Sequence, residues 1–280
     1  MLANWQPVAH FPRRGSHIAL AFPLDHSFET AGVVLCAEED EVVGTLVRGP
    51  ADTVGRQVAR MLSLDVDATA YADIATRDPA IGRVMRAHPG LRPVLFPSPY
   101  EAAVWAVMSQ RIAQRQAATT KAALSAEHGD AVELGSQTVR ALPSPERLLR
   151  VRAARGLTSE KIERLHAVAR AALEGVLDAD RLRALGYAEA VRVLQDIRGI
   201  GPFWSGAIYL RACGVTEPFP IDEPRTLRAL ADAHDLAAVP TGDALRAMVA
   251  KYEPFGMWVS VLLRVAANRG TMGEGARPAG

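Results

Sequence analysis

The sequence is poor in cysteine, in excess charge and in long apolar runs. Its two cysteines, Cys36 and Cys213, lie far apart and have no CxxC or metal-ligand spacing, so neither a disulfide framework nor a zinc site is indicated. There is no signal-peptide pattern and no apolar run of about 18 residues or more, so we expect neither secretion nor membrane spanning, but a cytoplasmic protein. The net charge of +1 in 280 residues excludes a bulk positive field. Any affinity for nucleic acid must therefore come from a local basic face and from backbone donors.

The composition is that of a soluble globular chain with room for two domains, since 49% of the residues are hydrophobic and 22% are charged. Residues 1–94 contain three apolar or β-branched runs bounded by Gly, Pro and acidic turns, which predict strands over 17–22, 32–37 and 41–47. Apolar residues at helical spacing follow over 51–64. We expect a small sheet with a helix packed on it, and we assign no chemistry to this domain.

The next part of the chain, residues 95–270, is predicted to be helical, because strand-like runs are absent after Leu64. Ser98 is placed to cap the first of these helices, with proline and glutamate in its first turn. Residues 257–265 are almost wholly apolar and predict a buried final helix. The small polar residues of 271–280 predict a disordered tail.

The stretch 194–230 organises the rest of the chain. It contains a two-glycine hairpin, Gly199-Ile200-Gly201, between two helical patterns, and the second helix restarts at Pro202. Glycine can take the positive φ that a tight reversal needs, and without side chains the backbone N–H groups can approach a phosphate at a helix N-terminus. The sequence therefore predicts a phosphate grip with no base preference. An ordinary connection between two helices is the alternative interpretation.

The hairpin belongs to a longer pattern, in which GIGP is followed by an amphipathic helix, by Gly214 and by FPIDE at 219–223. This pattern resembles the helix-hairpin-helix superfamily of DNA glycosylases, and it is most similar to the bacterial DNA-3-methyladenine glycosylase II family of alkylated-base enzymes. FPLDHSF at 22–28, SPYEAAVWAVMSQR at 98–111 and the helical pattern at 156–175 extend the resemblance over most of the chain.

The resemblance implies an α+β fold, in which a small mixed sheet-and-helix N-terminal domain precedes a larger all-α helix-hairpin-helix domain. It implies no catalytic metal and no cofactor, although the family's hairpin commonly holds a monovalent cation through backbone carbonyls. The implied partner is damaged double-stranded DNA, with no membrane, and we expect a monomer.

Gln110 and Arg111 occupy, in this resemblance, the turn from which relatives push a side chain into the gap left by an extruded nucleotide. Relatives often have an apolar wedge at the second position, and Arg111 departs from that pattern, although its flat guanidinium can stack on a base. A solvated polar helix end is the alternative interpretation. The hairpin residues Gly199, Ile200 and Gly201 would grip the phosphate backbone beside them.

The catalytic group is expected to be a carboxylate, because cleavage of an N-glycosidic bond builds positive charge on the sugar. Family members with the motif FPxDD use the second acid, which matches Glu223, whereas relatives with a shorter linker end in a single aspartate that matches Asp222. Pro224 makes Glu223 the N-cap of the next helix, a position where glutamate is a poor capper. Both acids stay candidates. The alternative is that they only complement the helix dipole.

The small number of lysines bears on the type of reaction. Bifunctional members of the superfamily form a Schiff base through a lysine in the second hairpin helix. This chain has only Lys121, Lys161 and Lys251, and the matching position is Phe203. The resemblance therefore implies a monofunctional enzyme, which leaves an abasic site without cutting the strand.

Aromatic residues near the hairpin and near the C-terminal end are candidates for a base pocket, because electron-rich rings stack well on a cationic, alkylated base. Phe203 is the first of them, and Trp204 is also a candidate for a core position. The full set of candidates is Phe203, Trp204, Tyr209, Phe255 and Trp258.

The sequence thus predicts a monofunctional DNA glycosylase that flips out and hydrolytically excises alkylated purines of the 3-methyladenine type in base excision repair. Two other hypotheses stay open. One is a non-catalytic helix-hairpin-helix protein that binds damaged DNA and is insensitive to loss of Asp222 and Glu223. The other is a glycosylase for a different lesion, which a panel of substrates would reveal.

Overall fold

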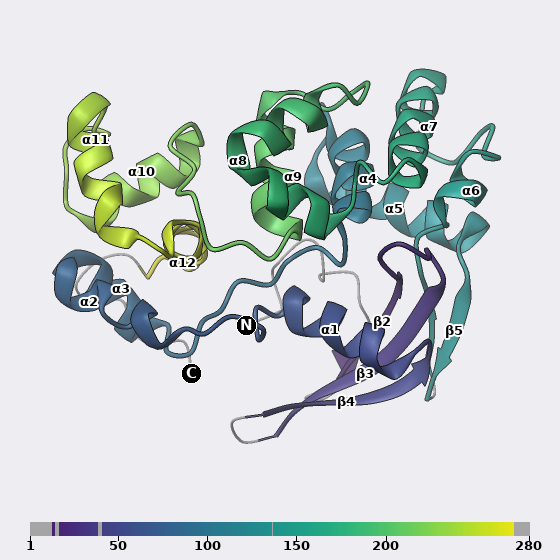
Figure 1. Ribbon diagram of the computed structural model, residues 1–280, viewed down its shortest axis with the longest axis horizontal. Coiled ribbons are helices and arrows are strands. Elements are labelled where there is room, and N and C mark those ends of the chain that lie inside the picture. The colour runs from purple at the N-terminus through teal and green to yellow at the C-terminus, as the bar shows by residue number, and fades with distance from the viewer. Residues whose placement is uncertain (1–12, 15–16, 39–40, 136, 272–280) are drawn as a thin grey trace. The chain divides into compact units, whose positions relative to one another are not determined.

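The computed structural model describes the chain over residues 13–14, 17–38, 41–135 and 137–271 (Figure 1). The described residues form two compact units, and each unit is made of two separate stretches of sequence. Unit 1 comprises the described residues of Met1–Met61 and Val94–Gly214, and unit 2 comprises those of Leu62–Pro93 and Val215–Gly280.

These units do not follow the consecutive division at residue 94 that the sequence suggested. Residues 62–93 belong to unit 2, and the chain then re-enters unit 1 beside the residue where it left. The Leu95 N–H donates to the Met61 carbonyl there, at 2.7 Å. A contact of this kind joins residues that are far apart in the sequence. Local composition and periodicity give no sign of it.

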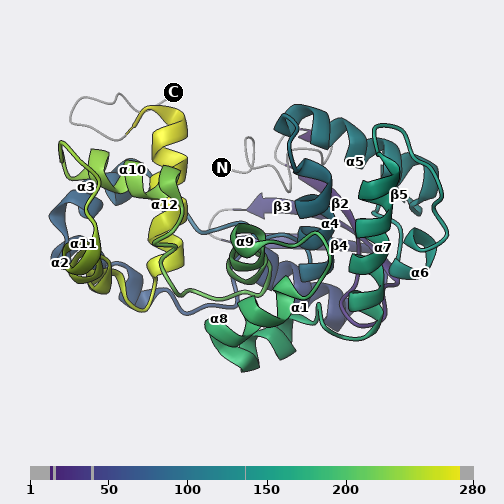
Figure 2. The same cartoon turned by 90° about the horizontal axis from the view of Figure 1, so that it is seen from above.

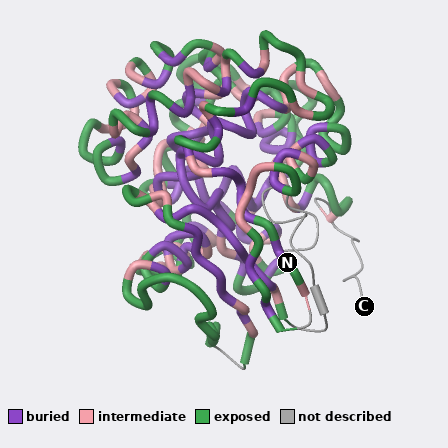
Figure 3. Tube along the Cα trace, turned by 90° about the vertical axis from the view of Figure 1, so that its right-hand side faces the viewer, coloured by how far each residue is buried: buried purple, intermediate pink, exposed green. Residues whose placement is uncertain are grey.

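Unit 1 contains an antiparallel sheet with the strand order β1-β2-β3-β4. Its strands are β1 (Arg13–Arg14), β2 (His17–Pro23), β3 (Thr30–Glu38) and β4 (Glu41–Arg48). β2 is buried from Ala19 onward and β3 over its first part, so these two strands form the inner region of the sheet (Figure 3). β4 is an edge strand, and all of its residues are exposed. The strands expected over 17–22, 32–37 and 41–47 are confirmed, and each extends slightly further.

A second sheet of two antiparallel strands, β5 (Ala131–Leu134) and β6 (Gln137–Arg140), packs against β2. Gly32 of β3 permits this packing, because a Cβ there would lie 2.5 Å from Cγ1 of Val132. The prediction that no strand follows Leu64 was therefore wrong in this region. Strands of four residues are too short to show a clear period in the sequence.

The remainder of unit 1 is mostly helical. Its helices are α1 (Ala51–Met61), α4 (Pro99–Ser109), α5 (Gln114–His128), α6 (Pro145–Leu148), α7 (Ser159–Leu173), α8 (Ala179–Gln195) and α9 (Pro202–Ala212). α4 is buried from Pro99 to Met108 and contacts α5, α7 and α9 (Figure 2). Ser98 caps α4 as expected, since its Oγ accepts the Glu101 N–H at 3.1 Å. This central helix sends its C-terminal end, at Ser109, toward the hairpin.

Unit 2 is built from helices and short 3-10 turns in its described residues. They are η2 (Thr69–Tyr71), α2 (Ile74–Arg77), α3 (Pro79–Ala87), α10 (Pro224–Ala233), α11 (Gly242–Val249), η3 (Ala250–Tyr252) and α12 (Gly256–Arg269). α12 is buried from Gly256 to Leu263, which confirms the buried helix expected over 257–265. Asp78 ties three of these elements together, because it caps α3 and accepts hydrogen bonds from His234 and Tyr252.

The α+β fold class expected from the sequence is confirmed, since the four-stranded sheet near the N-terminus is followed by a largely helical remainder. Among the described residues, no helix is both long and apolar enough to cross a membrane. The predicted tail 271–280 lies outside the described residues, apart from Thr271.

Candidate functional site

The hairpin lies in unit 1, between α8, which ends at Gln195, and α9, which begins at Pro202. Ile197 and Ile200 are buried and fasten the turn to the unit, and the Ile200 N–H donates to the Ile197 carbonyl at 2.9 Å. Gly199 has a φ of +97°, which is the positive φ that the sequence predicted for a tight reversal. The turn is thus held in place by its own apolar side chains.

The two glycines of the hairpin have different surroundings. A Cβ on Gly199 would lie 2.8 Å from Cδ of Arg164, whereas a Cβ on Gly201 would meet nothing within 4 Å. Gly201 is exposed and stands at the N-cap of α9. Because Ile200 uses its N–H inside the turn, the donors left for a ligand are those of the glycines and of the first turn of α9. The helix dipole favours an anion at this end.

An open cleft of about 630 Å³ lies beside the hairpin in unit 1, and we call it the hairpin cleft. It brings together all the residues predicted to bind DNA, although Gln110 and Arg111 are far from the hairpin in the sequence. The cleft is lined by Ser109, Gln110, Arg111, Arg164, Gln195, Ile197, Arg198, Gly199, Ile200, Gly201 and Trp204. Sequence reasoning missed Arg164 and Arg198. Arg198 could have been found, because it directly precedes the first glycine, but nothing in the sequence connects Arg164 with the hairpin.

Arg111 forms the tip of the turn between α4 and α5. It is exposed, and its φ of +59° lies in the left-handed region, where a non-glycine residue is strained. The Ile112 N–H donates to the Ser109 carbonyl at 3.5 Å and closes the turn. Among the described residues, no carboxylate pairs with its guanidinium. Arg111 is therefore a free cation on a fixed tip.

Gln110, in contrast, has its side chain engaged within the protein. Its Nε2 donates to the Gly199 carbonyl at 2.6 Å, and its Oε1 accepts from Nη1 of Arg164 at 2.8 Å. The side chain thus bridges the end of α4, the hairpin and α7. Of the two residues predicted to fill a gap in the duplex, only Arg111 has its side chain free in this structure.

Lys161 holds the end of α4 from the side of α7. Its Nζ donates to the carbonyls of Met108 and Gln110, at 2.6 and 3.0 Å. Burial and the neighbouring Arg164 lower the pKa of Lys161. The carbonyls of the last helical turn have no partner within the helix, and a lysine there satisfies them and complements the helix dipole.

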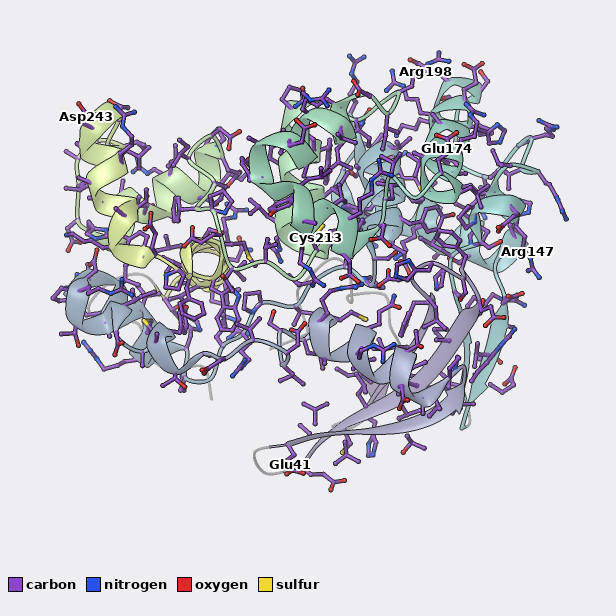
Figure 4. The ribbon with its side chains drawn as sticks, viewed as in Figure 1. Glu41, Arg147, Glu174, Arg198, Cys213 and Asp243 are labelled. Carbon is purple, nitrogen blue, oxygen red and sulfur yellow. The ribbon has the colours of Figure 1, made fainter. Side chains whose placement is uncertain are left out.

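Acidic side chains on α7 partly neutralise the cations of the cleft. Arg198 is exposed at the outer side of unit 1 (Figure 4), and its Nη1 lies 3.0 Å from Oε2 of Glu163. Nη2 of Arg164 lies 2.5 Å from Oε1 of Glu160. The cleft is thus basic, but its positive charge is partly balanced by these glutamates, in keeping with the low net charge of the chain.

The two candidate catalytic acids belong to unit 2, at the start of α10. Asp222 is exposed, whereas the Glu223 carboxylate accepts three hydrogen bonds and caps the helix. Its Oε1 accepts the Arg225 N–H at 3.3 Å, and its Oε2 accepts both the N–H and the hydroxyl of Thr226 at 2.6 Å. Glu223 is therefore held in one orientation, despite the poor capping tendency of glutamate.

The aromatic candidates of α9 differ in exposure. Phe203 is 53% exposed, and its ring meets that of Trp204 edge to face, with centroids 5.3 Å apart. Trp204 lines the hairpin cleft. Tyr209 is buried and packs edge to face on Tyr187 at 5.5 Å. Phe203 and Trp204 are thus the rings of α9 that a ligand could reach.

The remaining aromatic candidates form a cluster in unit 2. Phe255 and Trp258 are buried and pack with Tyr71, with centroid separations of 5.2–5.4 Å within the trio. The guanidinium of Arg92 lies 5.5 Å from the Trp258 ring. The Tyr71 hydroxyl and Nε1 of Trp258 are both buried, and neither has a hydrogen-bond partner among the residues that the structure describes. Buried polar atoms without a partner are uncommon in proteins.

The side chains and backbone carbonyls available as ligands decide which cations the chain could hold. Among the described residues, no group of three or more His, Cys, Asp or Glu side chains is arranged to hold a metal ion. A monovalent cation at the hairpin would use backbone carbonyls. The Gly199 carbonyl accepts from Gln110 and the Ile197 carbonyl from Ile200, but each keeps a second lone pair. Oxygen donors of this kind fit a hard cation.

Comparison with known proteins gives the fold. No protein-family model matches the chain. Over 198 residues, or 69% of the chain, it is 26% identical to a DNA-3-methyladenine glycosylase of Bacillus subtilis (strain 168), and the match spans 65% of that relative's length. The 3-methyladenine DNA-glycosylase from Archaeoglobus fulgidus superposes with a TM-score of 0.78 at 19% identity, covering 98% of this chain and 94% of that one.

A second solved structure is similar over a large part of the chain. The 8-oxoguanine glycosylase/lyase of Clostridium acetobutylicum, in complex with double-stranded DNA, has a TM-score of 0.67 at 15% identity, covering 88% of this chain and 87% of that one. The chain therefore has the fold of these glycosylases, and the resemblance to the alkylated-base type is confirmed.

Proposed function

We propose that the chain is a DNA glycosylase that flips alkylated purines of the 3-methyladenine type out of duplex DNA and excises them hydrolytically. The observation that carries this proposal is the hairpin cleft, where backbone donors at a helix N-terminus lie beside the free cationic tip Arg111. The similarity to glycosylases named for 3-methyladenine supports it. The proposed partner is damaged double-stranded DNA, and a monomer stays a prediction.

The grip and the filler come from unit 1. The hairpin Gly199-Ile200-Gly201 would hold one phosphate through the N–H groups of its two glycines and of the first turn of α9, and the uncovered face of Gly201 lets the backbone approach closely. A monovalent cation held by the hairpin carbonyls would add positive charge at this point. The Arg111 tip, which Gln110 positions, would meet the duplex beside the gripped strand, with the Arg111 guanidinium stacked in the gap.

The carboxylate comes from unit 2, and we favour Glu223 over Asp222. A group that stabilises a developing charge works best when it is already oriented, because no reorganisation is then needed in the transition state. The three donors on Glu223 provide that orientation, whereas Asp222 is exposed. Within the described part of the chain, Oε1 accepts one hydrogen bond, which is long at 3.3 Å, so this atom can also face the sugar or the attacking water.

The base pocket would be formed by the aromatic cluster of Phe255, Trp258 and Tyr71. Its rings would provide the apolar surface, and two polar groups of the cluster would face the base. The Trp258 Nε1–H can donate to a ring nitrogen or carbonyl of a base. Burial raises the pKa of the Tyr71 hydroxyl well above its usual range, so this group also stays a donor. Stacking on the electron-rich rings of this cluster would favour a base that carries positive charge.

The absence of lyase activity is supported by what the lysines do. Lys161 is bound to two carbonyls of α4, and Lys121 pairs with Glu101 at 3.0 Å. α9, the second helix of the hairpin, contains no lysine over Pro202–Ala212. No amine is therefore placed to form a Schiff base in that helix.

The proposal is tested by measuring two quantities for the wild type, Glu223→Gln and Asp222→Asn. These are release of free base from methylated duplex DNA and affinity for a duplex with one abasic site. We expect base release by the wild type, a loss of about 100-fold or more in Glu223→Gln, and retained binding by all three. Base release is also measured from duplexes that contain an oxidised or a deaminated base. If all three proteins bind and none releases base from any duplex, the protein is a damaged-DNA-binding protein. If base is released only from the oxidised or deaminated duplexes, it is a glycosylase for another lesion.

A further inference from the structure

The hydrogen bonds around Gln110 connect the two parts of the hairpin cleft that would touch DNA. We propose that Gln110, Lys161 and Arg164 form a latch that fixes the Arg111 tip relative to the hairpin, so that gripping a phosphate also places the guanidinium for base flipping. This inference rests on the proposed function and deepens it. Gln110 and Lys161 then act as positioning residues, and Arg111 is the residue that meets the DNA.

Lys161 is the first component of this latch. Its two bonds, to the Met108 and Gln110 carbonyls, hold the last turn of α4 from the outside. Lys161 lies near the N-terminus of α7, which Thr158 caps, since its Oγ1 accepts the Lys161 N–H at 3.2 Å. A cation bonded to carbonyls at a helix C-terminus forms charge-assisted hydrogen bonds, which are stronger than neutral ones. The end of α4 is thus fixed to the start of α7.

The Gln110 side chain is the second component. One end of its carboxamide binds the Gly199 carbonyl at 2.6 Å, and the other end binds Arg164 at 2.8 Å. The stem of Arg164 passes so close to Gly199 that a Cβ there would lie 2.8–3.1 Å from its Cδ, Cγ and Cβ. Glycine at this position therefore does two things: it allows the turn, and it leaves room for Arg164 to reach Gln110.

The backbone of Arg111 explains what the latch has to hold. A non-glycine residue at φ +59° is strained by about 1–2 kcal/mol, and such a conformation persists only when its surroundings fix it. Gln110, directly before Arg111, is bound through its carbonyl oxygen and through both ends of its carboxamide. The strained tip is thus fixed to the same hairpin that would hold the phosphate.

The latch predicts a specific failure when it is broken. The hairpin donors do not depend on Gln110 or Lys161, so DNA should still bind. The tip, however, would lose its fixed position, and misplacement of a positioning group by about 1 Å can cost about 100-fold in rate. A merely structural role would instead lower binding, flipping and thermal stability together.

The test uses Gln110→Met and Lys161→Met, with Gln116→Met and Arg115→Gln as controls. The control residues are exposed on α5, and Arg115→Gln removes one positive charge, as Lys161→Met does. Each protein is measured for its affinity for an abasic duplex and for its rate of base release. Base flipping is measured, at saturating protein, as the fluorescence of a 2-aminopurine placed in the strand opposite the lesion. We also expect Lys161→Arg to restore part of the flipping signal, because arginine can donate to the same carbonyls.

The expected result is abasic-site affinity within about threefold of the controls, with a loss of about 10- to 100-fold in base release and a reduced fluorescence rise. The latch is overturned if both latch variants flip and excise like the controls, or if their binding and melting temperature fall in step with activity. If the wild type neither flips nor excises, the proposed function fails together with the latch. If the wild type flips and excises the base, and the Gln110 and Lys161 variants do so equally well, the latch alone fails and the proposed function stands.

Discussion

His234 and Asp78 form an ion pair inside unit 2, with Nε2 of His234 2.9 Å from Oδ2 of Asp78. The other ring nitrogen, Nδ1, lies 2.9 Å from the Leu230 carbonyl. Carboxylate and carbonyl oxygens only accept, so both ring nitrogens must donate, and His234 is an imidazolium in this arrangement. The pair links α3 to α10, the helix that carries the candidate acids at its start.

The first prediction concerns the stability of unit 2 as a function of pH. The hydrogen bond to Asp78 raises the pKa of His234 above its ordinary 6.5, against the effect of burial. A group with a raised folded-state pKa contributes stability that is complete below 6.5 and is lost as pH rises through the folded-state pKa. Burial opposes ionisation of Asp78, but its hydrogen bonds bring the pKa down to about 2 from 3.8, so its contribution is lost only as pH falls below 3.8. The pair thus stabilises most between these limits.

Urea unfolding of the wild type and of His234→Gln at several pH values between 5 and 9 measures this effect. The free energy of unfolding of the wild type should fall relative to that of the variant as pH rises. Burial and Arg269 lower the pKa of His88, which acts in the opposite direction, but His88 is present in both proteins and cancels in the difference. A difference that does not change with pH would show that His234 is not charged in the folded state.

The second prediction concerns the two hairpin glycines. Gly199→Ala should lower the free energy of unfolding by on the order of 1–3 kcal/mol, because its φ is +97° and the new Cβ would displace Arg164. Gly201→Ala should leave stability nearly unchanged, since its φ is −95° and nothing lies near the new Cβ. If the phosphate approaches Gly201 as closely as proposed, this second variant should still weaken DNA binding. Equal binding by Gly201→Ala and the wild type would place the phosphate elsewhere.

The third prediction separates the shape of the Arg111 tip from its chemistry. Arg111→Gly can keep the left-handed backbone without strain, whereas Arg111→Ala keeps the strain of φ +59°. We expect both variants to lose base release by a similar factor, on the order of 100-fold, because both lack the guanidinium. Their melting temperatures should not fall below that of the wild type by more than a few degrees. Full activity in Arg111→Gly would exclude Arg111 as the filler of the gap.

The fourth prediction concerns the orientation of Glu223. The Thr226 hydroxyl donates to Oε2 of Glu223, and Thr226→Val removes that donor while it keeps the shape of the side chain and the backbone N–H. The rate of base release should fall by about 10-fold with little change in DNA affinity. Thr69→Val, at an exposed threonine in unit 2, is the matched control. An unchanged rate in Thr226→Val would favour Asp222 as the catalytic acid.

The fifth prediction concerns the ion pair between Glu163 and Arg198, which lowers the positive charge of the cleft. Glu163→Gln frees Arg198, whose ion pair is exposed and therefore weak, so DNA binding should tighten by no more than about fivefold at low salt. The gain should shrink as salt rises, because exposed charges are screened. Glu189→Gln frees Arg192, which does not line the cleft, and serves as the control. Weaker binding in Glu163→Gln would mean that Glu163 has a role of its own.

The sequence predicted those parts of the site that depend on local pattern. The positive φ of Gly199, the start of α9 at Pro202 and the capping of α4 by Ser98 each follow from residues within one or two turns. The orientation of Glu223 by Thr226 is also local, and a serine or threonine three residues after an N-cap is a signal that could have been used.

The features that the sequence did not predict depend on contacts over long separations. Lys161 and Arg164 reach Gln110 across 51 and 54 residues, and no periodicity connects α7 with the end of α4. The division of the chain into two units also depends on a contact over a long separation, the one between Leu95 and Met61. Burial and partners of single aromatic side chains, such as Trp258, also follow from tertiary packing and not from residue type.

The central claim is tested most directly by chromatography of the bases released when the wild-type protein acts on methylated duplex DNA, with the strands then examined for cleavage. We predict free 3-methyladenine and a strand that is intact until alkali cuts it at the abasic site. If the protein binds the duplex and releases no base, the claim that it is a glycosylase is contradicted. If base is released together with a cut strand, the reaction is that of a glycosylase/lyase and the monofunctional mechanism is wrong.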